Sequence, residues 1–448
     1  MANDLAAFIP EVWAQEALMV LEENMVIANL VHRDFENEVA RFGETVNTRR
    51  PGKFVMKRKV KGDDVTVQDA TAENVPVVLN QHIHTSFLVE DEDTSKSFQD
   101  LRAIYLVEAV KSLARGTDEM LLGETYQYLA NAAGKLGTAA TKASIIDTRT
   151  KMSNNKVPLD GRNFIITPDT EGALLNVAEF VEAHKRGDDG SAIREAHLGR
   201  LMGFDFFMCQ NAPAVAAGSS TEVAEVDNIG GYAAGTTVLA IDNTSLDLTA
   251  GSWCTIVGDM TPQKIISATG SPTTQITISP GLRSAVANDA DVTVYLPGAV
   301  DLSAGYASGW SKAITVKDFT VAPQTGQMVT FDAAAAKAVY SALSTPTTTS
   351  LLLNKPLEDA ESNNDVVGLG PAGQYNLAFH RNALALVSRP LAAPAPGTGA
   401  LSFVANYNGL GLRATITYDG NKQGHLVTLD MLCGIKVLDT DLGAVMLA

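Results

Sequence analysis

The sequence predicts an α+β protein that carries an inserted all-β domain. Three observations lead to this class. One long helical pattern lies near residues 97–132, and strand-like alternation occurs on both sides of it. A stretch from about 214 to 326 is rich in Gly, Thr, Ser, Ala and Val and has no helical period, which is typical of a small all-β module.

The composition is that of a folded protein. The chain has 448 residues, a formal net charge of −17, 46% hydrophobic residues and 19% charged residues, which argues against disorder. No apolar run reaches the roughly 18 residues of a membrane span, and no secretory signal pattern opens the chain, so we expect no membrane association. Three distant cysteines predict a reducing compartment without a disulfide framework: Cys209, Cys254 and Cys433.

The excess of acidic over basic residues also limits which partners we expect for the protein. It argues against a protein that coats nucleic acid through a basic surface. It remains compatible with a container whose lining must not bind nucleic acid, because a negative wall repels phosphate.

The first element expected is an amphipathic helix from Pro10 to about Val31. Pro10 suits a first helical turn. Apolar residues recur at helical spacing: Ala14, Leu18, Leu21, Met25 and Ala28. This helix could pack on its own core or serve as a terminal arm on a neighbouring subunit.

From Thr45 to Val89 the pattern changes to a long hairpin with segregated charge. Turn signals occur at Pro51-Gly52 and Gly62-Asp63, and Val65 and Val67 alternate like strand residues. One limb is basic and carries Arg49, Arg50, Lys53, Lys57, Arg58, Lys59 and Lys61. An acidic run follows the hairpin: Glu90, Asp91, Glu92 and Asp93.

Such a hairpin has too little core to be stable alone and needs a partner surface. The basic limb predicts an acidic partner. Two alternatives are a solvated loop and a nucleic-acid-binding limb, and the second lacks interleaved aromatic residues beyond Phe54.

The segment from Ser97 to about Ala132 reads as one helix. Ser97 and Asp100 resemble a capping box, and Leu106, Val110 and Leu113 begin an apolar stripe. A helix of this length would span about 50 Å and act as a structural spine, with bends possible at Gly116 and Gly123.

An α/β stretch comes next. Asn163–Thr167 predicts a buried strand, and Thr167 with Pro168 begins a helix that we expect to run to about Arg186 and stop at Gly187. A short helix is expected from about Ala192 to Met202. Phe204–Asn211 then reads as a strand.

The β-rich stretch from about 214 to 326 predicts five short strands, in TTVLAID, SWCTIVG, TQITISP, DVTVYLP and KAITVKDF. After it we expect an Ala-rich helix from Asp332 to Leu343, a strand followed by a short helix in QYNLAFHRNALALVSRPL, and antiparallel strands in the tail.

Apparent chemical motifs are weak. Gly368, Gly370 and Gly373 match GxGxxG, but strand-like residues follow where a nucleotide site needs a helix. His82 and His84 lack a third metal ligand, and His380 beside Arg381 reads as ordinary polarity. We therefore assign no catalytic, cofactor-binding or metal-binding residue and expect a protein that is not an enzyme.

The order of the parts resembles the major capsid (coat) proteins of tailed bacteriophages, specifically the gene-5-type coat proteins of short-tailed phages. The similar segments are IPEVWAQEALMVLEENMVIANLVHRDFENE, FGETVNTRRPG, IREAHLGRLMGFDFFMCQN, AFHRNALALVSRPL and GLGLRATITYDGNKQGHLVTLDMLCGIKVLD. They extend from the first residues to the last and are interrupted by the β-rich stretch.

The resemblance implies a fold with an arm, an extended loop, a peripheral lobe with a spine helix, and an axial lobe. The corresponding parts are the N-terminal arm (1–45), the extended hairpin loop (46–95), the spine helix with the first part of the shell core (96–213), the inserted β domain (214–326) and the rest of the core (327–448).

It also implies an icosahedral shell of hexamers and pentamers, a scaffolded procapsid, scaffolding and portal partners, and packaged double-stranded DNA bound without sequence specificity. The protein would assemble in the bacterial host cytoplasm and reside in the virion.

We hypothesise that the basic limb lies on an acidic surface of an adjacent subunit, with Glu90–Asp93 as the candidate. The alternatives to a phage capsid are a non-viral nanocompartment shell, a β-domain binding protein and an enzyme of mixed fold.

Overall fold

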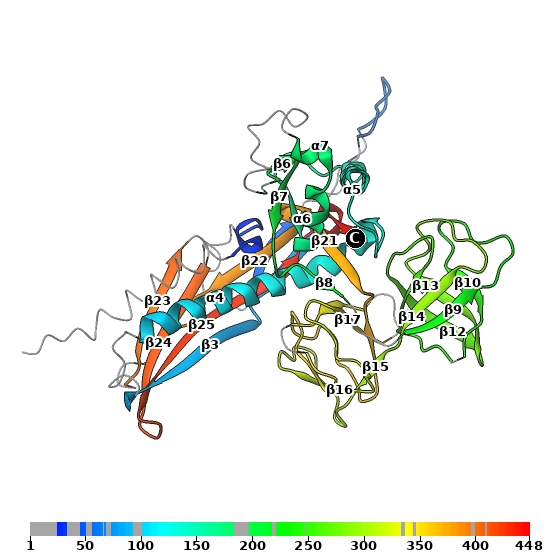
Figure 1. Cartoon of the computed structure of the whole chain (residues 1–448). Coiled ribbons are helices and arrows are strands. Elements are labelled where there is room, and N and C mark those ends of the chain that lie inside the picture. Colours follow the sequence, from blue (N-terminus) through cyan, green and yellow to red (C-terminus); the bar gives the residue numbers. More distant parts are fainter. Residues whose placement is uncertain are drawn as a thin grey trace, which may run out of the picture. The chain divides into compact units, whose positions relative to one another are not determined.

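A computed structural model describes residues 25–33, 45–50, 56–65, 67–68, 73–92, 101–182, 196, 198–216, 221–245, 247–332, 337–343, 346–395, 399–407 and 410–448. Two compact units divide the chain (Figure 1). The first comprises Met1–Met19, His32–Val110 and Leu384–Leu438; the second comprises Val20–Val31, Lys111–Ala383 and Asp439–Ala448. The chain is thus a mixed α+β protein.

The first unit is built around a five-stranded sheet whose longest strand is β25. β25 pairs antiparallel with β24 and β3 over its first part and with β22 over its last. The strands are β3 (Gln81–Glu90), β22 (Leu384–Arg389), β23 (Leu401–Tyr407), β24 (Leu410–Asp419) and β25 (Gly424–Val437). The antiparallel tail predicted from the sequence is therefore confirmed.

The short helix expected after His380 is wrong. Arg381–Ala383 forms one 3-10 turn (η3), and β22 follows as a strand. The first five residues of β22 are all buried, and the first four, Leu384–Val387, are a continuous apolar run. Such a run does not distinguish a helix from a doubly buried strand.

The first unit also contains a two-stranded ladder that packs beside β22. β1 (Thr45–Arg50) pairs antiparallel with β2 (Glu73–Val78). Val46, Val77 and Leu79 pack in one cluster with Ala385 and Val387 of β22. β25 has Gly434 at this place, where a Cβ atom would lie 2.3 Å from the Val78 carbonyl oxygen, so only glycine allows this backbone approach.

The predicted spine helix is confirmed in part. α4 (Leu101–Leu122) has 22 residues and is about 33 Å long at 1.5 Å per residue. Its first half belongs to the first unit, where the Tyr105 ring lies 5.8 Å from the Phe87 ring of β3. Beyond Leu122 the chain continues as a 3-10 helix, η2 (Gly123–Asn131), so the helix changes type at one of the two glycines expected to bend it. The expected cap at Ser97 lies outside the described residues.

The second unit contains a seven-stranded sheet of order β4-β26-β21-β5-β7-β6, with β8 beside β21. Its strands are β4 (Ala132–Gly134), β5 (Arg162–Ile166), β6 (Arg200–Leu201), β7 (Phe204–Met208), β8 (Ala214–Val215), β21 (Gly373–His380) and β26 (Gly443–Leu447). The helical segments are α5 (Lys142–Asn154), α6 (Pro168–Leu175), α7 (Ala178–Val181) and η4 (Thr440–Leu442).

The sequence located β5, β7 and the start of α6. The Thr167 hydroxyl accepts a hydrogen bond from the Thr170 N–H and caps α6, with Pro168 in the first turn. The helix expected to reach Arg186 instead stops at Leu175 and is followed by the single turn α7. The helix expected up to Met202 is also wrong in its described part, because β6 pairs with β7 there. In these two segments tertiary structure outweighed the local helical pattern, and at β6 the competing interaction is strand pairing.

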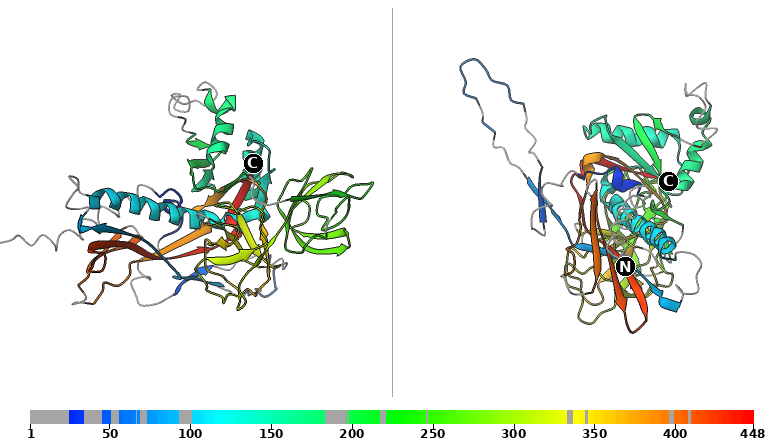
Figure 2. Two further views of the ribbon diagram at one scale, coloured as in Figure 1. Left: turned by 60° about the horizontal axis from the view of Figure 1, so that its bottom comes forward. Right: turned by 90° about the vertical axis from the view of Figure 1, so that its left-hand side faces the viewer.

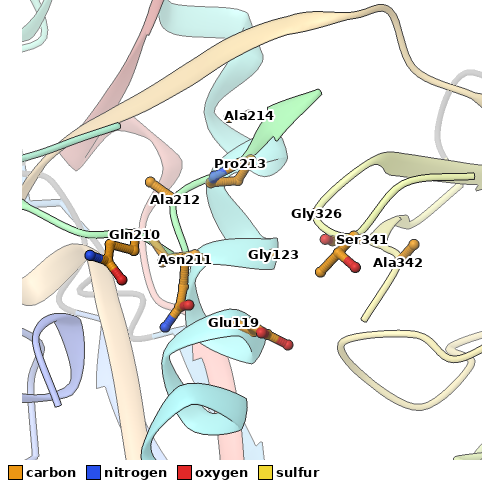
Figure 3. A pocket seen from close by; sticks show the side chains of 12 residues that line it. Glu119, Gly123, Gln210, Asn211, Ala212, Pro213, Ala214, Gly326, Ser341 and Ala342 are labelled. Carbon is orange, nitrogen blue, oxygen red and sulfur yellow. The ribbon is translucent and has the colours of Figure 1, made fainter. Parts of the chain in front are cut away.

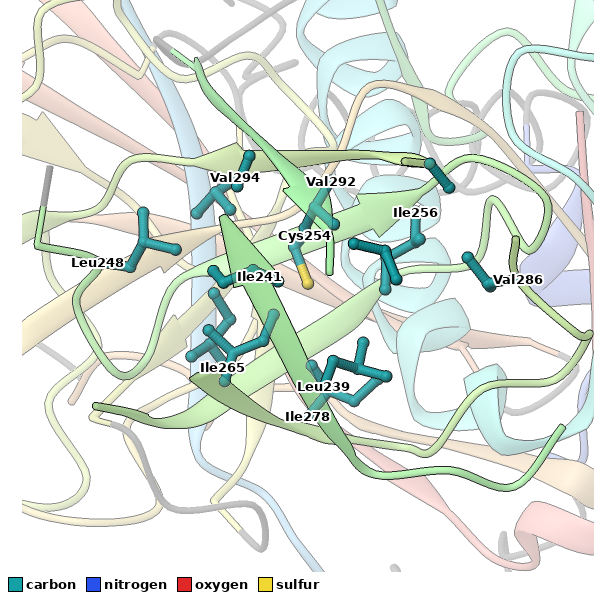
Figure 4. Packing of buried hydrophobic residues seen from close by; sticks show 14 of the residues in the cluster. Leu239, Ile241, Leu248, Cys254, Ile256, Ile265, Ile278, Val286, Val292 and Val294 are labelled. Carbon is teal, nitrogen blue, oxygen red and sulfur yellow. The ribbon is translucent and has the colours of Figure 1, made fainter. Parts of the chain in front are cut away.

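A closed six-stranded barrel occupies residues 221–295, in the order β10-β13-β12-β11-β14-β9. Its strands are β9 (Thr221–Val226), β10 (Val238–Asp242), β11 (Trp253–Ile256), β12 (Gln263–Gly270), β13 (Thr273–Ser279) and β14 (Asp291–Tyr295). Branched aliphatic side chains and Cys254 fill the interior (Figure 4). Register shifts along β12 are the irregularities that let a sheet curve enough to close.

A six-stranded sheet follows the barrel, in the order β18-β17-β20-β15-β16-β19. Its strands are β15 (Gly298–Val300), β16 (Ile314–Lys317), β17 (Met328–Phe331), β18 (Val339–Ser341), β19 (Ser350–Leu351) and β20 (Val366–Leu369). The helix expected from Asp332 to Leu343 is wrong in its described part, because Val339–Ser341 pairs with β17. The sequence predicts that the inserted β domain ends at residue 326. This sheet contains strands from both sides of that residue, with β15 and β16 before it and β17, β18, β19 and β20 after it.

All five strands predicted in the β-rich stretch are present, as β10, β11, β13, β14 and β16. The expected helix from Pro10 to Val31 lies mostly outside the described residues. Its described end forms a 3-10 turn, η1 (Ile27–Asn29), rather than an α-helix.

The two glycines of the spine predict opposite mutational effects. A Cβ atom at Gly123 would lie 2.6–2.7 Å from the side chain of Asn354, whereas none of the surrounding atoms lies within 4 Å of a Cβ at Gly116. Gly123→Ala should lower the free energy of unfolding by about 1–3 kcal/mol through overpacking. Gly116→Ala should raise it by about 0.5–1 kcal/mol because alanine favours the helix. Thermal and denaturant unfolding measure both, and equal effects would contradict the packing described.

Candidate functional site

The basic limb of the hairpin is an exposed charged feature of the described residues. We define the basic loop as residues 56–65, drawn as part of the blue trace beyond the β1–β2 ladder in the right-hand view of Figure 2. Four of the predicted cations lie in it and are exposed: Lys57, Arg58, Lys59 and Lys61. In β1, Arg49 and Arg50 pair through their backbones with Asn74 and Glu73. Lys53 lies outside the described residues.

The conformation of the basic loop differs in part from the expected strand. The turn expected at Gly62 is present: Gly62 has φ +105°, and the Asp63 N–H donates to the Val60 carbonyl oxygen at 3.2 Å. No strand includes Val65 or Val67. Both valines are exposed.

Exposed apolar side chains lie in the basic loop and directly after it. Met56, Val60, Val65 and Val67 are 83%, 68%, 70% and 83% exposed. Single exposed apolar residues are common, but four within a short basic segment form a surface suited to a protein partner. The sequence showed Val60 between Lys59 and Lys61, but the exposure of these apolar side chains was not predicted.

The acidic run lies at the end of β3. Glu90, Asp91 and Glu92 are exposed, and Asp93 lies outside the described residues. Asp91 is fixed in place: the Tyr418 hydroxyl donates to its Oδ2 at 2.8 Å, and the Asp91 N–H donates to the Gln423 carbonyl oxygen. The hydrogen bond to Asp91 raises the pKa of Tyr418, and the Tyr418 ring is half exposed beside the carboxylates.

The structure does not bring the two charged groups together within one chain. Within the described ranges, Lys57, Arg58, Lys59 and Lys61 form no hydrogen bond or ion pair. The four cations therefore form no ion pair in the part of their own chain that the structure describes, although Asp63 and Asp64 follow them in the same loop.

The histidine pair lies beside a buried charge pair. Asp430 on β25 is 2% exposed and accepts two hydrogen bonds from Arg413, the Nε–Oδ1 bond being 2.9 Å and the other joining Nη2 and Oδ2. His82 Nε2 lies 3.5 Å from the same carboxylate. This carboxylate is thus engaged by arginine, and among the described residues no group of three His, Cys, Asp or Glu side chains is placed to hold a metal ion.

The other apparent motifs are structural. Gly368, Gly370 and Gly373 lie in and between β20 and β21, so the described chain has no helix where a pyrophosphate site needs one. His380 Nδ1 accepts the Asn382 N–H at 3.3 Å. Burial, with Arg162 nearby, lowers the pKa of His380.

Two cavities of the second unit lack paired acid–base groups in their described linings. The cavity of about 170 Å³ in Figure 3 has Glu119, Gln210, Asn211 and Ser341 among its polar residues. A second, of about 410 Å³, has Asp169, Thr170 and Gln374. The Gln374 amide accepts from Thr170 at 2.7 Å and donates to Asp169 at 2.9 Å, so these groups satisfy one another. None of the described helices is long and apolar enough to cross a membrane.

Comparison with known proteins gives structural likeness only. No protein-family model matches the chain, and no curated protein does. Among solved structures, the chain is similar to a chain of Mycobacterium phage Che8 (14% identity, 94% of this chain and 90% of that chain, TM-score 0.46). It is also similar to a chain in the capsid of cyanophage P-SCSP1u (12%, 91% and 84%, TM-score 0.42).

A third similar chain comes from the mature capsid of bacteriophage PhiM1 (10% identity, 90% of this chain and 82% of that chain, TM-score 0.39).

The buried Arg413–Asp430 pair predicts a large mutational effect. Arg413→Met should destabilise the protein by about 3–5 kcal/mol, because it leaves a buried carboxylate without its cation. The double variant Arg413→Met/Asp430→Leu should cost much less, since neither charge remains. Denaturant unfolding measures both. Equal losses in the two variants would contradict the pairing.

Proposed function

We propose that this chain is the major capsid protein of a tailed phage, of the gene-5 type found in short-tailed phages, and that many copies form an icosahedral shell. One observation carries the proposal: the basic loop exposes cations and apolar side chains that have no partner in the described part of their own chain. A surface of this kind is suited to a second protein surface. The resemblance of the sequence segments to capsid proteins identifies a second copy as that partner.

The acidic run is the proposed acceptor on the neighbouring copy. Exposed ion pairs contribute only about 0–1 kcal/mol each, whereas burial of one exposed valine or methionine contributes about 1.5–3 kcal/mol. The apolar side chains would therefore supply most of the affinity, and the charges would set orientation and encounter rate. Contacts that are weak singly and repeated over a shell favour reversible assembly and correction of errors.

The remaining parts of the proposal follow from the same resemblance. Hexamers and pentamers would form a scaffolded procapsid with scaffolding and portal proteins, and double-stranded DNA would fill it. The net charge of −17 supports a lining that repels DNA and lets it slide during packaging. The barrel has its own apolar core, which supports a role as an inserted domain that aids folding or subunit contacts.

Charge reversal tests the proposed interface. Lys57→Glu/Arg58→Glu/Lys59→Glu should abolish shells while leaving a folded chain, because the loop would repel an acidic neighbour. Negative-stain microscopy and light scattering detect shells, and circular dichroism reports the fold. As a matched control, Lys156→Glu/Lys312→Glu/Lys436→Glu reverses three exposed lysines on other elements and should still assemble.

A charge swap identifies the acceptor. Adding Glu90→Lys and Glu92→Lys to the reversed loop should restore shells, since opposite charges face each other again. Normal shells from the loop variant alone would refute the interface. Failure of the swap, with the loop variant inactive, would place the acceptor elsewhere. A folded wild-type chain that forms no shell with its scaffolding partner would refute the capsid function.

A further inference from the structure

The barrel and the sheet that follows it share one chain path. We call residues 221–295 the first module and residues 298–369 the second module. Residues 226–235 read VDNIGGYAAG and residues 300–309 read VDLSAGYASG, so six of the ten positions are identical. The strands also have the same neighbour order, with β15, β16, β17, β18, β19 and β20 in the places of β9, β10, β11, β12, β13 and β14.

Backbone hydrogen bonds link the two edge strands of the second module. The Leu343 N–H donates to the Leu352 carbonyl oxygen at 2.7 Å, and the Asn354 N–H donates to the Ser341 carbonyl oxygen at 3.0 Å. These bonds lie at the ends of β18 and β19, whose counterparts β12 and β13 are paired in the first module. The second module therefore closes at the same place as the barrel.

The correspondence extends to a tyrosine in the repeated segment. The Tyr232 hydroxyl accepts the Ala240 N–H at 2.8 Å, and the Tyr306 hydroxyl accepts the Thr315 N–H at 2.7 Å. In both modules this tyrosine thus holds the second strand from outside the strand ladder.

Each module has an apolar core of its own. The two clusters have no residue in common, and corresponding strand positions fill them. These positions are Leu239, Ile241, Cys254, Ile256, Val292 and Val294 in the first module, and Ile314, Val316, Val329, Phe331, Val367 and Leu369 in the second.

The first module docks on the second through Trp253 and the turn at Gly251. The Trp253 Nε1–H donates to the Thr330 hydroxyl at 2.9 Å, and Trp253 is only 5% exposed. Gly368 of β20 allows this approach, because a Cβ atom there would lie 2.2 Å from the Gly251 carbonyl oxygen and 3.3 Å from the Trp253 ring.

Thr293 occupies the place of Gly368 in the first module. It lies opposite Thr255 in the β11–β14 ladder, as Gly368 lies opposite Thr330 in the β17–β20 ladder. The module itself therefore accepts a β-branched side chain at this position. The docked first module is what requires glycine in the second.

We infer that residues 221–369 are two tandem repeats of one barrel module, and that Gly368 determines which module receives the other. The glycine opens the receiving face of the second module. Thr293 covers the same face of the first module, which therefore ends the array, as terminal repeats do. The inference concerns this chain alone and does not depend on the proposed shell.

Exchange of Gly368 for its counterpart tests the receiving face in the full-length protein. In the background Trp13→Phe/Trp310→Phe, Trp253 is the only tryptophan. Gly368→Thr should shift its fluorescence to longer wavelength and raise its quenching by acrylamide severalfold, because the threonine side chain would occupy the place of the Gly251 carbonyl. Hydrogen exchange should show the strands of both modules still protected.

Ala313→Val is the matched control. It also gives the second module the residue of the first, Val238, but at a position that is exposed in both modules. Trp253 fluorescence should stay unchanged in this variant. An unchanged Trp253 signal in Gly368→Thr, or an equal change in Ala313→Val, would overturn the receiving face. A second module that unfolds in Gly368→Thr would overturn the correspondence with Thr293.

The two tyrosines test whether the modules are separate. Tyr232→Phe should lower hydrogen-exchange protection within residues 221–295, and Tyr306→Phe should lower it within residues 298–369, because each removes one hydroxyl acceptor. Loss of protection across both modules in either variant would contradict the inference of two modules with independent cores.

Discussion

The first unit depends on the backbone ladder of β25. This strand pairs with β3, β22 and β24, and the register joins Gln81–Glu90 to residues 424–433. Segments more than 300 residues apart are thereby fixed in one sheet. The same strand approaches β2 at Gly434, so it also supports the base of the hairpin that carries the basic loop.

Buried carboxylates recur at places where separate elements of one unit meet. Asp430 is bound by Arg413, Asp118 by the N–H groups of Val26 and Ala28, and Asp259 in the barrel by two side chains and by the N–H groups of Arg283 and Ser284. Each carboxylate has partners, and a buried charge without partners would be costly. These contacts specify which segments meet, whereas the apolar clusters supply most of the stability.

The basic loop differs from these buried carboxylates, because its charged groups are exposed. Its cations and apolar side chains are exposed, and the four cations form no ion pair with the described residues of their own chain. A protein that gains this contact only from other copies can fold as a single subunit and still assemble. The proposed shell depends on this separation between the contacts that fold one subunit and the contacts that join subunits.

The sequence by itself determined the mixed α+β class, the spine helix up to Leu122, the strands β5, β7 and β21, the tail strands β24 and β25, and the five strands of the β-rich stretch. In these places periodicity, caps and turn residues agreed with the final environment. The sequence also located the basic and acidic groups, because the positions of charged residues can be read directly from it.

Tertiary structure decided the rest. Val339–Ser341, in the described end of the expected Ala-rich helix, pairs as a strand, β22 is a strand because both of its faces are buried, and α6 stops at Leu175. Strand pairing outweighed local helix propensity in the first two of these segments. The contacts of Asp118 were also invisible in the sequence, because its partners are backbone N–H groups about 90 residues away, and no local pattern records a contact of that kind.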